Sequence, residues 1–295
     1  MTPTASRAAA LLVRSVGRRG PAISVSASSV SRMATVDRSS VRTAATLSAG
    51  DALTKLATEL PHKDVIRYQH KNIKWSLKHV DYHSDSLANG FIDYGFQPGD
   101  KVLSWLPLHF GEQHILQFAC SKAGLVLYHL DPKQAITDKA GATEALKRAL
   151  EVTEANILVS QEAGDDVNYV KLCEDIIPEL RIFDCGEGMP FFTPRFPHLR
   201  VAIHTGFDIQ DKRGMEPLKH MLLPAGTLKT RLRDLGMSVD GATPLMGELA
   251  TGKDGMPVKG KVLTNEEVVS QGVWPEMTGI LKKEYQEIEG VGVVF

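Results

Sequence analysis

The sequence predicts an α/β fold, in which a mostly parallel sheet is flanked by helices. Short apolar runs alternate along the chain with segments whose apolar residues recur every three or four positions. This alternation is typical of βαβ units. The composition agrees with a packed core, because 43% of the 295 residues are hydrophobic and 23% are charged. Such values exclude a disordered or low-complexity chain.

The first half of the chain carries the clearer pattern. Val80, Ser84, Leu87 and Phe91 share one face of an expected helix, and Gly95 follows where its C-cap belongs. The other expected helices are 51–60, 110–123, 143–152 and 167–177. The expected strands are 65–68, 73–75, 101–106, 125–130, 157–160 and 181–184. Parallel strands joined through helices imply right-handed crossovers, with helices on both faces of the sheet.

The pattern weakens beyond Cys185. We expect a strand at 199–203, a short helix at 215–223, and helical stretches at 265–271 and 278–286. Gly236–Gly260 is rich in glycine, threonine and proline, and is predicted to be a long exposed loop. The last six residues, Gly-Val-Gly-Val-Val-Phe, predict a strand.

The N-terminal residues differ from the rest in charge. Residues 1–50 hold seven arginines, no lysine and one acidic residue, a charge of +6, whereas the remaining 245 residues hold 27 basic and 34 acidic residues. A helix here places Arg7, Arg14 and Arg18 on one face. An Arg-rich, Ser-rich and acid-poor start is typical of an organelle transit peptide; a basic disordered arm is the alternative. We expect a mitochondrial transit peptide at 1–45, cleaved between Arg32 and Ala49, and an α/β domain at 46–295.

Several kinds of function fit poorly. The body has a charge of −7, which disfavours nucleic acid, and no apolar run reaches the eighteen residues of a membrane span. Cys120, Cys173 and Cys185 show no ligand spacing and predict thiols in a reducing compartment. His79 and His83 lie four residues apart on an expected helix, but no third ligand accompanies them, so we expect no metal site.

A Gly- and Lys-rich stretch, 247–264, is the main candidate for binding chemistry. Glycine lets backbone N–H groups approach phosphate oxygens. Two partial P-loop patterns occur, but Asp254 and Val262 stand where Ser or Thr would hold Mg²⁺. A polar surface loop is the simpler interpretation.

The order of several short blocks resembles the N-terminal subdomain of the adenylate-forming enzymes, the acyl-CoA synthetase and luciferase superfamily. The blocks include Ser86-Leu-Ala-Asn-Gly-Phe91, Gly95-Phe-Gln-Pro-Gly-Asp-Lys-Val102, Lys122-Ala-Gly-Leu-Val126, Leu130-Asp-Pro132 and Phe196-Pro-His-Leu-Arg-Val-Ala-Ile-His204. The resemblance runs from about Asp51 to Leu263. It implies the fold of that subdomain and places the nucleotide loop at 251–260.

The loop departs from the family pattern Thr-Ser-Gly-Thr-Thr-Gly-x-Pro-Lys-Gly. The vestigial loop keeps Thr251, Gly252, Gly255, Pro257, Lys259 and Gly260. Lys253 and Asp254 replace two hydroxyl residues, Val258 is inserted, and Asn265 stands where the family has histidine. A carboxylate beside a triphosphate weakens binding. The family's metal-binding glutamate, ribose-binding aspartate and catalytic lysine all follow the loop, and about thirty residues follow it here. We therefore expect no catalytic residue, no cofactor and no adenylation.

Three functions follow as hypotheses. The first is a non-catalytic subunit of a large mitochondrial complex, peripheral to the matrix side of the inner membrane. Its size, leader and degenerate fold are similar to those of accessory proteins of the green-algal mitochondrial ATP synthase, in the peripheral stalk or at the dimer. The second is a residual nucleotide- or acyl-binding protein. The third is a fragment of an ATP-dependent acyl-CoA ligase.

Overall fold

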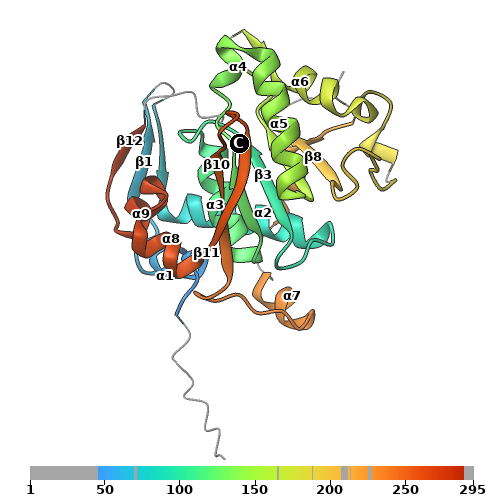
Figure 1. Cartoon of the computed structure of the whole chain (residues 1–295). Coiled ribbons are helices and arrows are strands. Elements are labelled where there is room, and N and C mark those ends of the chain that lie inside the picture. Colours follow the sequence, from blue (N-terminus) through green and yellow to red (C-terminus); the bar gives the residue numbers. More distant parts are fainter. Residues whose placement is uncertain are drawn as a thin grey trace, which may run out of the picture. The chain divides into compact units, whose positions relative to one another are not determined.

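The computed structural model describes residues 46–288 except 70–71, 165, 188, 207–211, 213 and 225–227. The expected transit peptide at 1–45 and the expected strand at 290–295 lie outside the described residues. Within them, a central sheet has helices on both faces (Figure 1).

The central sheet has seven strands in the order β11-β10-β4-β3-β5-β8-β9. The strands are β3 (Lys101–Trp105), β4 (Val126–His129), β5 (Ile157–Ser160), β8 (Val201–His204), β9 (Glu216–Pro217), β10 (Pro244–Thr251) and β11 (Pro257–Thr264). All neighbours are parallel except β10 and β11, which form an antiparallel hairpin. The prediction of a mostly parallel α/β sheet is therefore confirmed.

Alternation along the strands divides the core into two layers. Val102 packs on the layer of α1 (Ala49–Glu59), α2 (Leu77–Asp93), α3 (Gly111–Ala123), α8 (Asn265–Gln271) and α9 (Pro275–Leu281). Leu103 packs on the other layer, with α5 (Lys139–Thr153) and α6 (Tyr169–Ile176). Because successive side chains of a strand point to opposite faces, a strand that is buried on both sides is apolar throughout. This explains the continuous apolar runs in the sequence.

Helix α3 is buried over its whole length, including Glu112, Gln113 and His114. It ends at Gly124, whose φ of 74° is the left-handed C-cap conformation that glycine adopts easily. A small sheet, in the order β12-β1-β2, lies beside this layer. Its strands are β1 (Asp64–Tyr68), β2 (Ile73–Ser76) and β12 (Gln286–Ile288).

Short elements complete the described chain. They are α4 (Gln134–Thr137), β6 (Ala163–Gly164), β7 (Val167–Asn168), η1 (Pro178–Arg181), η2 (Cys185–Glu187), η3 (Leu218–Met221) and α7 (Leu228–Asp234). None of the described helices has the length and apolar character that crossing a membrane requires.

Four expected elements are wrong or misplaced. Residues 181–184 form the end of a 3-10 helix and a turn instead of a strand, and Ile182 is exposed. The expected helix at 215–223 is the short strand β9 followed by η3. The helix expected at 278–286 begins earlier, because Pro275 occupies the first helical turn, and ends at Leu281. Most of 236–260 forms the hairpin β10–β11 instead of a loop. Gly247 lies within β10, where Tyr128 approaches it closely, and Gly255 lies in the turn between the strands.

Candidate ligand site at the β10–β11 hairpin

The vestigial loop is the tight turn of the β10–β11 hairpin. Thr251 pairs with Pro257, and residues 252–256 close the turn. Gly255 has a φ of 78°, a conformation that a side chain makes costly. Pro257 is the first residue of β11, a position at which a strand tolerates the missing N–H of proline.

Three backbone N–H groups of the turn donate hydrogen bonds within the turn. Gly252 N donates to Met256 O at 2.8 Å, and Gly255 N donates to Gly252 O at 3.1 Å. Met256 N donates to Asp254 Oδ1 at 3.1 Å. A phosphate-binding loop offers such N–H groups to the anion. In this conformation three of them are occupied, and the Asp254 carboxylate adds negative charge.

A cavity of about 400 Å³ lies beside the turn. It is bounded by the segment that follows β4, by Ala145 of α5 and by the end of the hairpin. Its lining residues are His129, Leu130, Asp131, Lys133, Gln134, Ala145, Leu249, Ala250, Thr251, Gly255 and Pro257. Ligands of parallel α/β sheets commonly bind at the carboxyl ends of strands, where His129–Lys133 lies.

The polar groups of the cavity are held by local contacts. His129 Nε2 donates to Leu106 O at 2.8 Å, and burial lowers the pKa of His129, so the ring is neutral near pH 7. Lys133 N donates to Asp131 Oδ1 at 2.9 Å, which fixes the turn after β4. Lys133 and Thr251 are exposed and supply a cation and a hydroxyl at the rim. The cavity lining therefore combines apolar residues such as Leu130 and Leu249 with a cation and a hydroxyl that can bind a carboxylate or a phosphate.

The structure brings together half of the predicted site residues. Thr251, Gly255 and Pro257 line the cavity, and Gly252 lies within the turn. Lys259 and Gly260 lie farther along β11, outside the cavity lining, and are exposed. The sequence reasoning missed His129, Lys133 and Gln134, although the block Leu130-Asp-Pro132 at the end of a strand pointed to them.

Asn265, at the position where the family pattern has histidine, is a structural residue. Its Oδ1 accepts hydrogen bonds from Ser121 Oγ at 2.5 Å and from Ala49 N at 3.1 Å. Its Nδ2 donates to Thr243 O at 3.0 Å. The side chain is buried, and these contacts connect the start of α8 with α1, α3 and the segment before β10.

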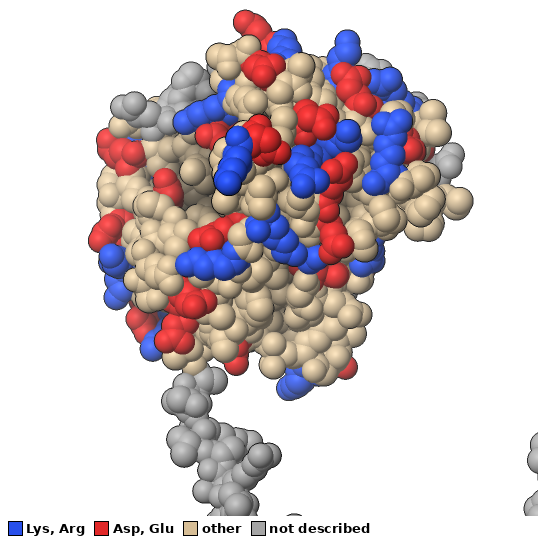
Figure 2. Space-filling model, in the orientation of Figure 1, with Lys and Arg blue, Asp and Glu red and all other residues tan. Residues whose placement is uncertain are grey.

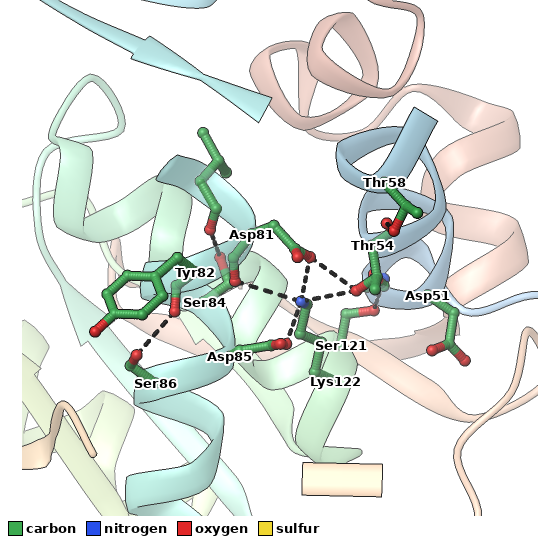
Figure 3. Close-up of polar contacts among 12 residues, drawn as sticks. Asp51, Thr54, Thr58, Asp81, Tyr82, Ser84, Asp85, Ser86, Ser121 and Lys122 are labelled. Atoms are coloured by element: carbon green, nitrogen blue, oxygen red, sulfur yellow. Dashed lines mark hydrogen bonds and ion pairs between the residues drawn. The ribbon is translucent and has the colours of Figure 1, made fainter. Parts of the chain in front are cut away.

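A second polar cluster joins the first three helices (Figure 3). Lys122 of α3 is buried, and its Nζ lies 2.6 Å from Asp81 Oδ1 and 3.0 Å from Thr54 Oγ1. It also forms an ion pair with Asp85, one turn farther along α2. Figure 3 shows the ammonium group between the two carboxylates and Thr54. The cluster joins α1, α2 and α3 and acts in their packing.

The remaining predicted residues have local roles. His79 Nδ1 accepts a hydrogen bond from Ser76 N at 3.2 Å, which caps α2. His83 lies against Trp75, with ring centroids 5.7 Å apart, and burial lowers its pKa. Cys120 and Cys173 are buried free thiols, whereas Cys185 is half-buried. On the face drawn in Figure 2, acidic and basic side chains are interspersed.

Comparison with known proteins identifies the relatives of this fold. Residues 53–182 match the family described as AMP-binding enzyme. The chain is 25% identical over 224 residues to YngI of Bacillus subtilis (strain 168), whose name describes an acyl-CoA synthetase. It is 21% identical over 224 residues to the mitochondrial medium-chain acyl-CoA ligase ACSF2 of Macaca fascicularis. Both matches cover 75% of this chain, but only 38% and 34% of those proteins.

Solved structures confirm the fold. The acetoacetyl-CoA synthetase of Streptomyces lividans matches with a TM-score of 0.62 and 16% identity, over 83% of this chain and 38% of that chain. The luciferase-like enzyme of the mealworm Zophobas morio matches with a TM-score of 0.60 and 14% identity, over 83% of this chain and 55% of that chain. The α/β fold is thus that of acyl-CoA synthetase structures, and residues 53–182 are similar to the AMP-binding enzyme family.

Proposed function

We propose that this chain is a ligand-binding protein of the acyl-CoA ligase type, which holds a nucleotide or acyl ligand without adenylating it. One observation carries the proposal: the hairpin turn uses its own N–H groups, while a cavity of about 400 Å³ persists beside it. The relatives named as acyl-CoA synthetase and ligase support the ligand class. The hydrogen bonds within the turn support the non-catalytic part, because they use N–H groups that would otherwise bind the triphosphate during adenylation.

Isothermal titration of the full chain with AMP and with a medium-chain acyl-CoA tests this function. We expect micromolar binding of at least one of them. The variants Thr251→Val and Lys133→Met should each weaken that binding about tenfold, since each removes one polar contact, worth about 1–1.5 kcal/mol. Lys55→Met, an exposed lysine on α1, is the matched control. Binding of neither ligand, or equal binding by all variants, contradicts the proposal.

Adenylation itself is measured by exchange of labelled pyrophosphate into ATP in the presence of a carboxylic acid. The proposal predicts no exchange above the rate without protein. Exchange that depends on the acid would show that the chain is an enzyme and would overturn the non-catalytic part.

A second candidate is an accessory subunit of a mitochondrial inner-membrane complex, with the ATP synthase as the named hypothesis. The Arg-rich, acid-poor residues 1–45 favour import, and the structural use of Asn265 favours retention of the fold rather than the chemistry. Native electrophoresis of mitochondria, followed by detection of this chain, tests it. Migration with a large complex supports the candidate, and migration as a free monomer contradicts it.

A further inference from the structure

The outer strand of the central sheet presents an open edge. In the described part of the chain, β11 is terminal in the strand order and pairs only with β10. It is eight residues long, as is β10, and residues 258–262 are all exposed. An edge strand keeps one row of backbone N–H and C=O groups directed away from its sheet. These groups form a template for a further strand.

The side chains of this edge are basic and apolar. Lys261 is 60% exposed, and its Nζ lies 3.9 Å from Glu248 Oε1 on β10. Lys259 is exposed on the same strand, and Val258 and Val262 are 45% and 42% exposed. Lysines on an edge discourage unspecific pairing. Two half-exposed valines beside them add an apolar surface that a protected edge does not need.

Charge disfavours a second copy of this chain as the occupant when two β11 strands pair about Gly260. Antiparallel pairing of two β11 strands about Gly260 places Lys259 of one copy opposite Lys261 of the other, on both sides of the centre. Like charges directly opposite each other destabilise a strand pair. An occupant with carboxylates at these positions replaces the repulsion by attraction.

We propose that the β11 edge is a docking site for an extended acidic segment of another protein, which adds a strand to the central sheet. Backbone hydrogen bonds supply affinity, acidic residues face Lys259 and Lys261, and apolar residues cover Val258 and Val262. Val258, Lys259, Lys261 and Val262 lie outside the cavity lining, so their variants leave the lining residues unchanged.

Fluorescence anisotropy of the full chain with two short labelled peptides tests the proposal. One peptide alternates glutamate with valine, and the other alternates lysine with valine. We expect the acidic peptide to bind at least tenfold more tightly than the basic one. In the double variant Lys259→Glu/Lys261→Glu this preference should reverse, because both cross-strand charges change sign. The double variant Lys55→Glu/Lys171→Glu makes the same charge change at exposed sites on α1 and α6 and should keep the preference.

Hydrogen exchange separates strand addition from loose charge attraction. The acidic peptide should slow the exchange of amides within 258–262 and leave those of α6 unchanged. Three results overturn the proposal: binding of neither peptide, a preference that both double variants change equally, or no protection of β11. If sedimentation shows a dimer of this chain, and if Lys259→Glu/Lys261→Glu changes the stability of that dimer, the edge binds a second copy instead.

Discussion

Ser121 Oγ donates a hydrogen bond of 2.5 Å to Asn265 Oδ1, and this contact joins two segments that are 144 residues apart. Ser121 Oγ also accepts from Gly50 N at 2.7 Å. Asn265 therefore connects α1, α3 and α8 at the position where the adenylate-forming pattern carries a histidine. Its polar atoms serve the packing of these three helices.

The first prediction concerns Asn265. The variant Asn265→Ala should lower the free energy of unfolding by about 2–4 kcal/mol, since it leaves the buried Ala49 N–H and the Ser121 hydroxyl with unmet hydrogen bonds. Urea unfolding followed by circular dichroism measures it. Gln271→Ala, at the exposed end of α8, is the control and should change stability by less than about 0.5 kcal/mol. A loss below about 1 kcal/mol in Asn265→Ala would show that these contacts are dispensable.

The second prediction concerns the ion cluster of Lys122. Removal of the buried ammonium in Lys122→Met leaves Asp81 and Asp85 facing each other, so we expect a loss of about 3 kcal/mol. Both aspartates are partly exposed, which places the loss at the lower end of the usual range. The triple variant Lys122→Met/Asp81→Asn/Asp85→Asn should recover part of that stability, because the unpaired charges are gone. If the triple variant is less stable than Lys122→Met, the charge argument fails.

The third prediction is a pH dependence that His114 carries. Burial lowers the pKa of His114 to about 4, and its Nδ1 lies 3.0 Å from the Tyr68 hydroxyl. The folded state therefore favours the neutral ring, whereas the unfolded chain binds a proton near pH 6.5. The contribution of His114 to the free energy of unfolding is fully present above about pH 6.5 and decreases as the pH falls toward 4. The expected loss between pH 7.5 and pH 5 is about 2 kcal/mol.

The comparison of two variants isolates this effect. His114→Gln should flatten the stability profile between pH 7.5 and pH 5, whatever its absolute stability. His62→Gln, an exposed histidine between α1 and β1, should leave the slope unchanged. An unchanged slope in His114→Gln would assign the acid sensitivity to other groups, such as His83 and His129, whose pKa values burial also lowers.

The fourth prediction is a gain of function in the hairpin turn. Asp254→Thr supplies one hydroxyl, keeps the Lys253 cation and frees Met256 N from the Asp254 carboxylate. We expect Mg·ATP to bind about tenfold more tightly than to the natural chain, through removal of one negative charge and addition of a hydrogen-bond donor. Glu248→Gln removes a negative charge from β10 outside the turn and is the control. No difference between the two variants means that the turn does not limit nucleotide binding.

Much of the fold could be predicted from the sequence, because the central strands are buried on both faces. Strands such as Ile157–Ser160 are continuous apolar runs, and the helix that the sequence predicts at 265–271 has the bounds of α8. The hairpin could not be predicted. Gly247 and Gly260 normally indicate loops, yet here they lie in strands where Tyr128 and Glu248 leave no room for a side chain. The strand order brings these residues together, and local composition does not reveal it.

The candidate site can be predicted only in part, because the strand order and not the local sequence brings its residues together. The sequence motif located Thr251, Gly255 and Pro257, which line the cavity. His129 and Lys133 are more than a hundred residues earlier, and only the pairing of β4 with β10 places them beside the turn. The acceptors of the N–H groups in the turn depend on the backbone conformation of the turn, and residue spacing does not predict that conformation.

The ratio of the affinities for AMP and Mg·ATP tests the central claim most directly. Titration calorimetry of the full chain at one salt concentration gives both dissociation constants. Because the N–H groups of Gly252, Gly255 and Met256 are occupied within the turn, the two extra phosphates should add nothing, and Mg·ATP should bind no more tightly than AMP. Mg·ATP binding that is tenfold tighter or more, and that Asp254→Thr does not strengthen, would contradict the account.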